Sequence, residues 1–137
     1  MTEKMKNWLT GFPLWNGEVL TVDYTDGMPE HCGLYCRGLE EVSRKTDILG
    51  NGEIYHRLHF TLCRTADRFG DNTAHAQWLL ALQAWIGPQS VLGLAPVFGD
   101  VAQRERIWAH SGKLQDSKQA GTARYTAEIT VEFISLF

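Results

Sequence analysis

The chain has 137 residues, of which 44% are hydrophobic and 21% are charged, and its formal net charge is −3. This length and composition leave room for one domain with a buried core, so we expect a single domain over residues 1–137. The acidic balance disfavours nucleic-acid binding through phosphate contacts, and no apolar run reaches the ~18 residues of a membrane span. Three cysteines, an odd number, argue against a secreted disulfide framework. We therefore expect a protein that is made and used in a cytosol.

The first predicted element is a short helix at the start of the chain. Thr2 is a suitable cap, and Met5, Trp8 and Leu9 recur at helical spacing. These three apolar side chains would form a stripe that docks on a sheet. Gly11 comes after the stripe and ends the helix.

Short strands are predicted next. Residues 18–25 alternate in the manner of a strand, and residues 32–37 form a further strand, which Gly38 separates from the next element. A hairpin then covers residues 39–64, around a turn at residues 48–52. We expect these consecutive strands to pair antiparallel.

The second half of this hairpin alternates with period 2, which is typical of a strand with one face on a core. One set of alternating residues is Ile54, His56, Leu58, Phe60 and Leu62, and the other is Tyr55, Arg57, His59, Thr61 and Cys63. Asn51 and Gly52 predict a type I′ turn, because both central residues of that turn need positive φ.

A second helix is predicted over residues 73–86, and we expect it to be the one long helix of the fold. Asp71 or Asn72 is a suitable N-cap, and Gly87 with Pro88 supplies the end. Its apolar face contains Trp78, Leu79, Leu80, Leu82, Trp85 and Ile86.

Residues 87–100 form a Gly- and Pro-rich loop that still carries apolar side chains, including Val97 and Phe98. Exposed apolar loops commonly contact a partner. A last hairpin comes next, with strands over residues 104–115 and 123–137 joined by a polar turn at residues 116–122.

The order of these elements predicts an α+β fold. We expect a mostly antiparallel β-sheet, with the long helix and the short N-terminal helix packed on one face. Open sheet edges would favour pairing with another copy of the chain.

Several residues invite a metal or catalytic site, but their spacing is unfavourable. The candidates for zinc are His31, Cys32, Cys36, His56, His59 and Cys63. In an extended strand, Cys32 and Cys36 lie about 13 Å apart at ~3.3 Å per residue, too far to share one metal. Cys32 beside His31 is a poor nucleophile pair, since adjacent strand residues point to opposite faces. Solvated turns explain most of the clustered carboxylates, so we predict no catalytic, cofactor-binding or metal-binding residues.

Polar side chains on the central strand have two interpretations. They form either a solvated sheet face or a subunit interface or channel wall, because Tyr and Arg are over-represented at contacts. We add to these candidates two arginines at the start of the last hairpin and two apolar residues of the loop over residues 87–100. The candidate contact residues are therefore Tyr55, Arg57, His59, Val97, Phe98, Arg104 and Arg106.

The segment LEEVSRKTDILGNGEIYHRLHFTLCR is succeeded by the helix TAHAQWLLALQAWI and the closing strands RIWAHSGKLQ and ARYTAEITVEF. This order of elements resembles the tail terminator proteins of long-tailed phages and prophages, also described as minor capsid or tail completion proteins. The resemblance covers nearly the whole chain and rests on the order and character of the elements.

The resemblance implies a small non-enzymatic structural subunit that closes into a ring, usually a hexamer, on top of the finished tail tube. Such a ring stops tube polymerisation and joins the tube to the head connector protein, and DNA passes through its hole. The implied partners are further copies of the chain, the tail tube protein and the head connector protein, with no cofactor and no membrane. The implied location is the virion tail, reached from the host bacterial cytoplasm during assembly.

An alternative of a different class is a small-molecule-binding or hot-dog-like enzyme domain, in which the sheet wraps the long helix. That alternative predicts a pocket lined by Asp23, His31 or His59.

Overall fold

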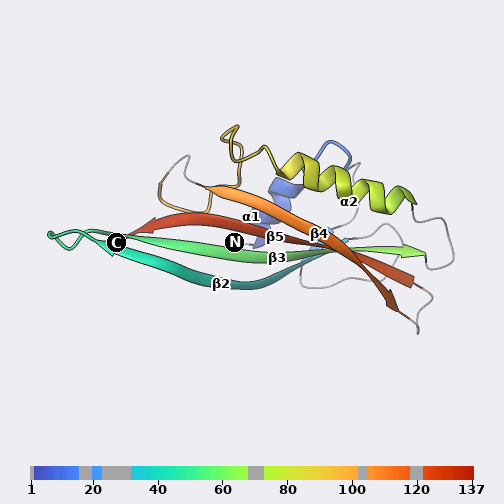
Figure 1. Cartoon of the computed structure of the whole chain (residues 1–137), viewed down its shortest axis with the longest axis horizontal. Coiled ribbons are helices and arrows are strands. Elements are labelled where there is room, and N and C mark those ends of the chain that lie inside the picture. The colour runs from blue at the N-terminus through green and yellow to red at the C-terminus, as the bar shows by residue number, and fades with distance from the viewer. Residues whose placement is uncertain (1, 16–19, 23–31, 68–72, 102–104, 118–121) are drawn as a thin grey trace.

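A five-stranded sheet with two helices on one of its sides makes up the described part of the chain (Figure 1). The computed structural model describes residues 2–15, 20–22, 32–67, 73–101, 105–117 and 122–137. The strand order is β1-β2-β3-β5-β4. In chain order the elements are α1 (Thr2–Leu9), β1 (Leu20–Val22), β2 (Cys32–Thr46), β3 (Gly52–Asp67), α2 (Thr73–Ile86), β4 (Arg106–Ser117) and β5 (Thr122–Leu136).

The predicted α+β class and the mostly antiparallel sheet are confirmed. β2, β3, β5 and β4 pair antiparallel in that order. The first strand departs from the prediction, because β1 pairs parallel with β2, with Leu20 opposite Cys32. The rest of the strand predicted over residues 18–25 lies outside the described residues.

The second helix has the predicted bounds, but the expectation of a long helix is wrong. α2 contains 14 residues, about 21 Å at 1.5 Å per residue. β3 contains 16 residues, which span about 50 Å at ~3.3 Å per residue. The helix is therefore much shorter than the strands it covers, and the N-cap candidates Asp71 and Asn72 lie outside the described residues.

Gly38 does not separate two strands as predicted. β2 runs without interruption from Cys32 to Thr46 and absorbs Gly38 in an irregularity, where Cys36 pairs with Phe60 and Gly38 with His59. Arg37 is the extra residue, and Gly38 has a φ of 134°, which residues with a Cβ rarely adopt. A backbone bulge thus lets one strand continue through a glycine that resembles a break in the sequence.

The hairpin turn also differs from the predicted Asn51-Gly52 type I′ turn. Gly52 is the first residue of β3 and pairs with Thr46, and the positive φ of 85° lies at Gly50. Asp47 organises the loop, since its Oδ1 accepts hydrogen bonds from the backbone N–H groups of Leu49 and Asn51, both at 2.9 Å. The hairpin therefore has a five-residue loop, residues 47–51, in place of the expected two-residue turn, and the Asp47 side chain stabilises this loop.

The core lies between the sheet and the helices. The apolar set predicted for β3 is buried at Leu58, Phe60 and Leu62, and β5 adds Ile129 and Val131. All five side chains belong to one hydrophobic cluster, which the residues of both helices complete. The period-2 pattern predicted for β3 therefore identified its core face correctly.

The helices contribute their predicted apolar stripes, with one exception. Met5 and Leu9 of α1 and Leu82 and Ile86 of α2 are fully buried. Leu80, predicted on the apolar face of α2, is 63% exposed. No helix among the described residues is long and apolar enough to cross a membrane.

An aromatic cluster ties the N-terminal segment to α2. The ring centroids of Trp8 and Trp85 lie 4.7 Å apart, those of Phe12 and Trp78 5.4 Å, and those of Trp15 and Trp78 5.6 Å. Tilted and edge-on ring pairs at these distances are favourable beyond their buried area. The cluster therefore fixes α1 and residues 10–15 against α2.

The loop after α2 returns to the sheet at Gly99 and Asp100. The backbone N–H of Asp100 donates to the carbonyl of Ile134 at 2.8 Å, and the Asp100 carboxylate accepts from the N–H of Leu136 at 2.9 Å. A Cβ on Gly99 would overlap the Ile134 carbonyl oxygen. The loop can approach β5 this closely because residue 99 has no side chain.

We expect Gly99→Ala to lower the free energy of unfolding by about 1–3 kcal/mol, because the added methyl overlaps backbone that has no room to move. Urea unfolding followed by circular dichroism measures the change. Gly87→Ala is the matched control, since a Cβ there would meet its nearest atom at an ordinary 3.6 Å. Equal stability of Gly99→Ala and Gly87→Ala would contradict the prediction.

Candidate functional site

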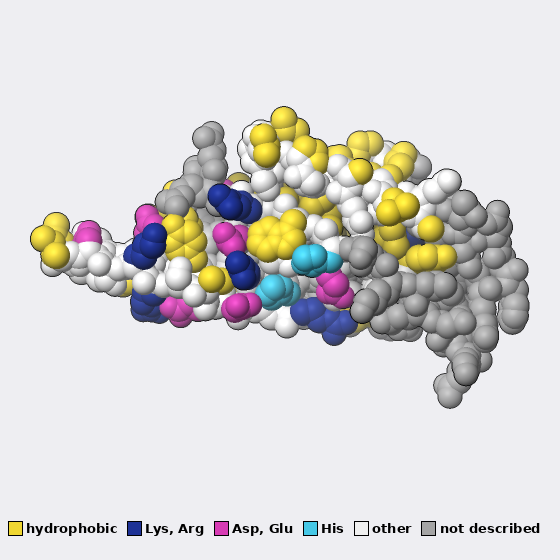
Figure 2. Space-filling view, in the orientation of Figure 1, with side chains coloured by type: hydrophobic (Ala, Val, Ile, Leu, Met, Phe, Trp, Pro, Cys, Tyr) yellow, Lys and Arg dark blue, Asp and Glu magenta, His cyan; other side chains and the backbone are white. Residues whose placement is uncertain are grey.

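A row of alternating charges crosses the sheet on the face that points away from the helices. Glu40 of β2, Arg57 of β3, Glu132 of β5 and Arg106 of β4 are successive register partners. Cross-strand partners point to the same face, so the row reads negative, positive, negative, positive across the four strands. Figure 2 shows side chains of both charges gathered with histidines over the sheet.

Hydrogen bonds hold this charge row and its neighbours in place. Arg57 Nε donates to Glu132 Oε2 at 3.1 Å. His59 Nδ1 lies 3.2 Å from Thr130 Oγ1, and its Nε2 lies 3.1 Å from Glu40 Oε2. These pairs are partly solvated, and pairs of this kind stabilise a fold by at most about 1 kcal/mol. Their charges therefore remain available to a partner.

Four of the predicted contact residues share this polar face. Arg57 and Arg106 belong to the charge row, and His59 lies in the next row of the sheet. Tyr55 lies on the other side of the charge row, and the Lys45 ammonium lies 5.5 Å from the centroid of its ring. The structure thus brings Tyr55, Arg57, His59 and Arg106 together on one surface.

The other predicted contact residues lie elsewhere. Phe98 stands on the helix side of β5, with its ring centroid 5.9 Å from that of Phe133. Val97 is 54% exposed, and its carbonyl accepts a hydrogen bond from Lys4 Nζ at 2.7 Å. These two residues therefore belong to a surface beside α1 and not to the polar face. Arg104 lies outside the described residues.

Among the described residues, β1 is the strand that pairs with the side of β2 away from β3, and it ends at Leu34; we call residues 36–46 of β2 the outer edge. β1 pairs with β2 at Cys32–Leu34, and every residue of the outer edge is exposed. Arg44 Nε donates to Glu41 Oε1 at 2.8 Å, and this hydrogen bond holds the pKa of Glu41 below its ordinary value. Charged side chains on an open edge discourage indiscriminate strand pairing, so a partner of the outer edge must match its charges.

The loop of the hairpin, residues 47–51, forms an apolar tip at the far end of the molecule (Figure 1). Ile48 is 102% exposed and Leu49 is 81% exposed. Side chains that bury nothing in the single chain gain most from a partner. The tip is therefore a second candidate contact surface.

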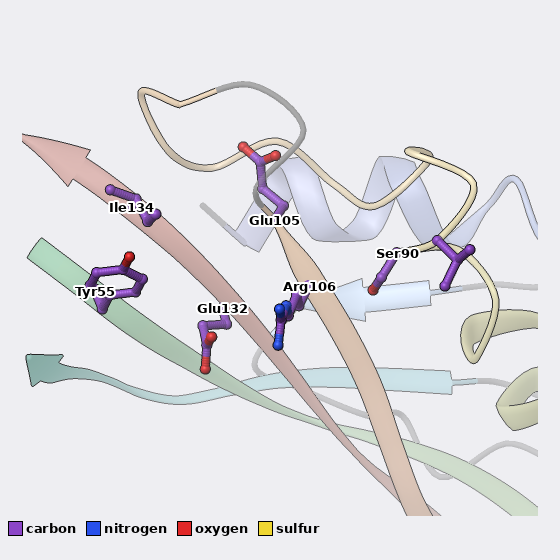
Figure 3. A pocket seen from close by; sticks show the side chains of 7 residues that line it. Tyr55, Ser90, Glu105, Arg106, Glu132 and Ile134 are labelled. Carbon is purple, nitrogen blue, oxygen red and sulfur yellow. The ribbon is translucent and has the colours of Figure 1, made fainter. Parts of the chain in front are cut away.

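A cavity of about 630 Å³ opens where β4 begins (Figure 3). Arg106 and Glu132 of the charge row line it, and so do Glu105 and residues of the loop after α2. Ser90, in that loop, caps the strand edge, because its Oγ accepts from the backbone N–H of Ile107 at 2.9 Å. The full lining is Tyr55, Ser90, Val91, Glu105, Arg106, Glu132 and Ile134.

The cysteines and histidines considered for metal binding are dispersed. Cys32 and Cys63 are buried, Cys36 is exposed, and all three thiols are free. His56 stacks on Phe133 with ring centroids 5.0 Å apart. Within the part of the chain that the structure describes, no three His, Cys, Asp or Glu side chains are grouped to hold a metal ion. His31 lies outside that part.

Sequence reasoning missed the apolar tip and the buried Glu105. The sequence did contain an indication of the tip, because two aliphatic residues lie in a turn between Asp47 and Gly50, where polar residues are usual. Glu105 had none, because a glutamate between two arginines is typical of a solvated segment. No protein-family profile matches this chain, and no curated protein sequence matches it at a significant level.

Proposed function

We propose that this chain is a non-enzymatic structural protein of a phage or prophage tail, a terminator subunit that assembles into a ring. The ring would cap the tail tube, stop its polymerisation and join it to the head connector protein, with DNA passing through the hole. In the family that the sequence resembles, the ring is usually a hexamer. The virion tail is the proposed location, after assembly in the bacterial cytoplasm.

The charge row is the observation that carries this proposal. It ends with a negative residue, Glu40, at the β2 edge and with a positive residue, Arg106, at the β4 edge. In this row the two edges of one chain therefore carry opposite charges, which two neighbouring copies could pair. A contact between two different surfaces of the same chain is heterologous, and heterologous contacts close into a ring when the rotation between copies allows it.

The exposed apolar side chains of the tip and of the loop after α2 support further contacts. The tip exposes Ile48 and Leu49, and the loop after α2 exposes Val91 and Leu92 at 90% and 62%. In the proposed assembly, the loop over residues 87–100 docks on the tail tube protein. The polar turn predicted over residues 116–122 is a second docking candidate, and residues 118–121 of it lie outside the described residues.

Charge exchange at the two edges tests the proposal. At micromolar protein and low salt, we expect native mass spectrometry of the full chain to show a closed oligomer. Glu40→Lys and Arg106→Glu should each reduce its amount, because each places like charges across the contact, and the double variant should restore it. Glu3→Lys is the matched control, since Glu3 is exposed on α1 and belongs to neither of the two sheet edges.

If the protein has the mass of one chain at every concentration, and none of these substitutions changes that mass, the result would count against the ring. Addition of the purified tube protein then provides the decisive measurement, because a ring that forms only on the tube must still appear in that mixture. Failure to form an oligomer with the tube present would overturn the proposal.

The cavity favours the alternative of a small-molecule-binding or hot-dog-like domain, since 630 Å³ is a suitable volume for a ligand. Among the residues which that alternative requires, His59 does not line the cavity, and Asp23 and His31 lie outside the described residues. The alternative predicts a single copy that copurifies with a discrete small molecule, which mass spectrometry under denaturing conditions would identify.

A further inference from the structure

Residues 39–46 of the outer edge carry their charges in a self-complementary order. The segment reads LEEVSRKT, with Glu40 and Glu41 before the centre and Arg44 and Lys45 after it. When a second copy of the segment lies antiparallel to the first, Glu40 comes opposite Lys45, and Glu41 comes opposite Arg44. Each contact then occurs twice. Opposite charges across a strand pair are favourable and like charges are unfavourable, so the segment fits a second copy of itself.

The bulge at Val42 places these opposite charges on matching faces. Two copies related by a two-fold axis perpendicular to the sheet keep the same face upward, so opposite residues must share a face. In a regular strand, residues five apart lie on opposite faces. Because Val42 is an extra residue, the β3 partners of Glu40 and Lys45 are residues 57 and 53, which share a face. The β3 partners of Glu41 and Arg44 are residues 56 and 54, which share the other face.

The two edges of the sheet differ in how open they are to a further strand. Every residue of the outer edge is exposed, and β1 ends at Leu34, before the segment 39–46 begins (Figure 1). On β4, Ser90 Oγ accepts from the N–H of Ile107 at 2.9 Å and donates to its carbonyl at 3.3 Å. Gln83 Nε2 donates to the carbonyl of His110 at 2.8 Å. These side chains occupy backbone groups that a strand beside β4 would need, so strand pairing is favoured at β2.

Within a single copy, the charges of this segment have only weak, solvated partners. Arg44 Nε donates to Glu41 Oε1 at 2.8 Å, but the two side chains are 53% and 45% exposed. The Lys45 ammonium lies 5.5 Å from the centroid of the Tyr55 ring. Across the two-fold axis, two Glu41–Arg44 pairs meet as four alternating charges, and such a network is more favourable than isolated surface pairs. A second copy therefore improves contacts that the single chain leaves in solvent.

We infer that the outer edge binds the outer edge of a second copy, in a two-fold symmetric dimer that continues the sheet across both chains. We call this assembly the edge dimer. Beyond the segment 39–46, the tip of each copy lies along residues 36–38 of the other, which gives the exposed Ile48 and Leu49 a neighbour. The edge dimer stands without the proposed ring. Both assemblies use Glu40, so a chain in the edge dimer is a resting subunit whose edge is closed to the ring.

Charge exchange between two full-length variants tests the edge dimer. Both carry Arg106→Glu, which weakens the ring contact and leaves β2 unchanged. The basic-edge variant adds Glu40→Lys and Glu41→Lys, and the acidic-edge variant adds Arg44→Glu and Lys45→Glu. Each should have the mass of one chain in native mass spectrometry where the Arg106→Glu parent is dimeric, because like charges then face each other. Mixed in equal amounts, with one variant ¹⁵N-labelled, the two should form a dimer with one copy of each.

A single charge reversal provides the second measurement. In the Arg106→Glu chain, Lys45→Glu should raise the dissociation constant of the dimer about tenfold or more, since it places like charges opposite Glu40 twice in the symmetric contact. Lys6→Glu is the matched control and should leave the constant unchanged, because Lys6 lies in the last turn of α1 and belongs to neither sheet edge. Sedimentation equilibrium measures both constants.

The outcomes separate the edge dimer from the proposed ring. An Arg106→Glu chain with the mass of one chain at every concentration up to millimolar would overturn the edge dimer. A mixture of the two edge variants that stays monomeric, or equal effects of Lys45→Glu and Lys6→Glu, would overturn the outer edge as its contact. A wild-type chain that forms the edge dimer but no ring with tube protein would overturn the ring alone.

Discussion

Replacing Phe60 by alanine should lower the free energy of unfolding by about 3–5 kcal/mol. Phe60 is fully buried on β3, the central strand of the sheet, and belongs to the cluster that joins the sheet to both helices. Its loss leaves a cavity that rigid strands on either side cannot fill. A domain of this size is stable by about 5–15 kcal/mol in total, so the variant should unfold at a much lower urea concentration.

Leu39→Ala is the control for this prediction. Leu39 lies on the neighbouring strand β2, but it is 50% exposed on the outer edge. Its truncation should change stability by no more than about 0.5 kcal/mol. Similar urea midpoints for Phe60→Ala and Leu39→Ala would show that the core does not lie where the sheet and the helices meet.

Truncation of Trp78 should have an effect of similar size, about 3–5 kcal/mol. Its indole Nε1 donates to the carbonyl of Leu14 at 3.2 Å, and the Arg64 guanidinium lies 4.2 Å from its ring centroid. Trp78→Ala would remove the anchor of residues 10–15 and uncover Arg64, which is only 5% exposed. Near-ultraviolet circular dichroism should lose intensity together with the urea midpoint, since Trp15 loses its packing partner.

Trp108→Ala is the informative comparison, because Trp108 is half-buried on the polar face, with the Arg57 guanidinium 5.9 Å from its ring. We expect a much smaller loss of stability than for Trp78→Ala. A larger loss in Trp108→Ala than in Trp78→Ala would show that the polar face contributes more to the fold than the aromatic cluster does.

Local periodicity predicted the elements well where one face of an element is buried. The bounds of α2 and the core face of β3 agree with spacings of 3.6 and 2 residues. The wrong predictions concern features that depend on residues far away in the sequence. The parallel pairing of β1 depends on β2, and α2 is short only in comparison with the strands that it covers. Leu80 is exposed because the helix is covered on one side only.

Glycines and charges were harder to interpret. Gly38 and Gly52 have the same sequence signature as breaks and turns, yet both lie within strands, because a bulge and the Asp47 side chain supply the required geometry. Three of the contact candidates alternate on the central strand, and Arg106 shares their face because it and Arg57 both pair with Glu132 of β5. Glu105 could not be predicted, since its burial comes from the loop after α2.

The two irregularities of β2 have a consequence for tracing relatives of this chain. An extra residue reverses which side every later side chain faces. The second irregularity, between Glu41 and Ser43, reverses it again. Polar-face positions are thus odd-numbered at Tyr35, even-numbered at Glu40 and odd-numbered once more at Lys45. Against a relative whose strand lacks these two bulges, an alignment that keeps β2 free of gaps would compare inward with outward positions between them, whereas single-residue gaps at 37 and 42 would preserve the correspondence.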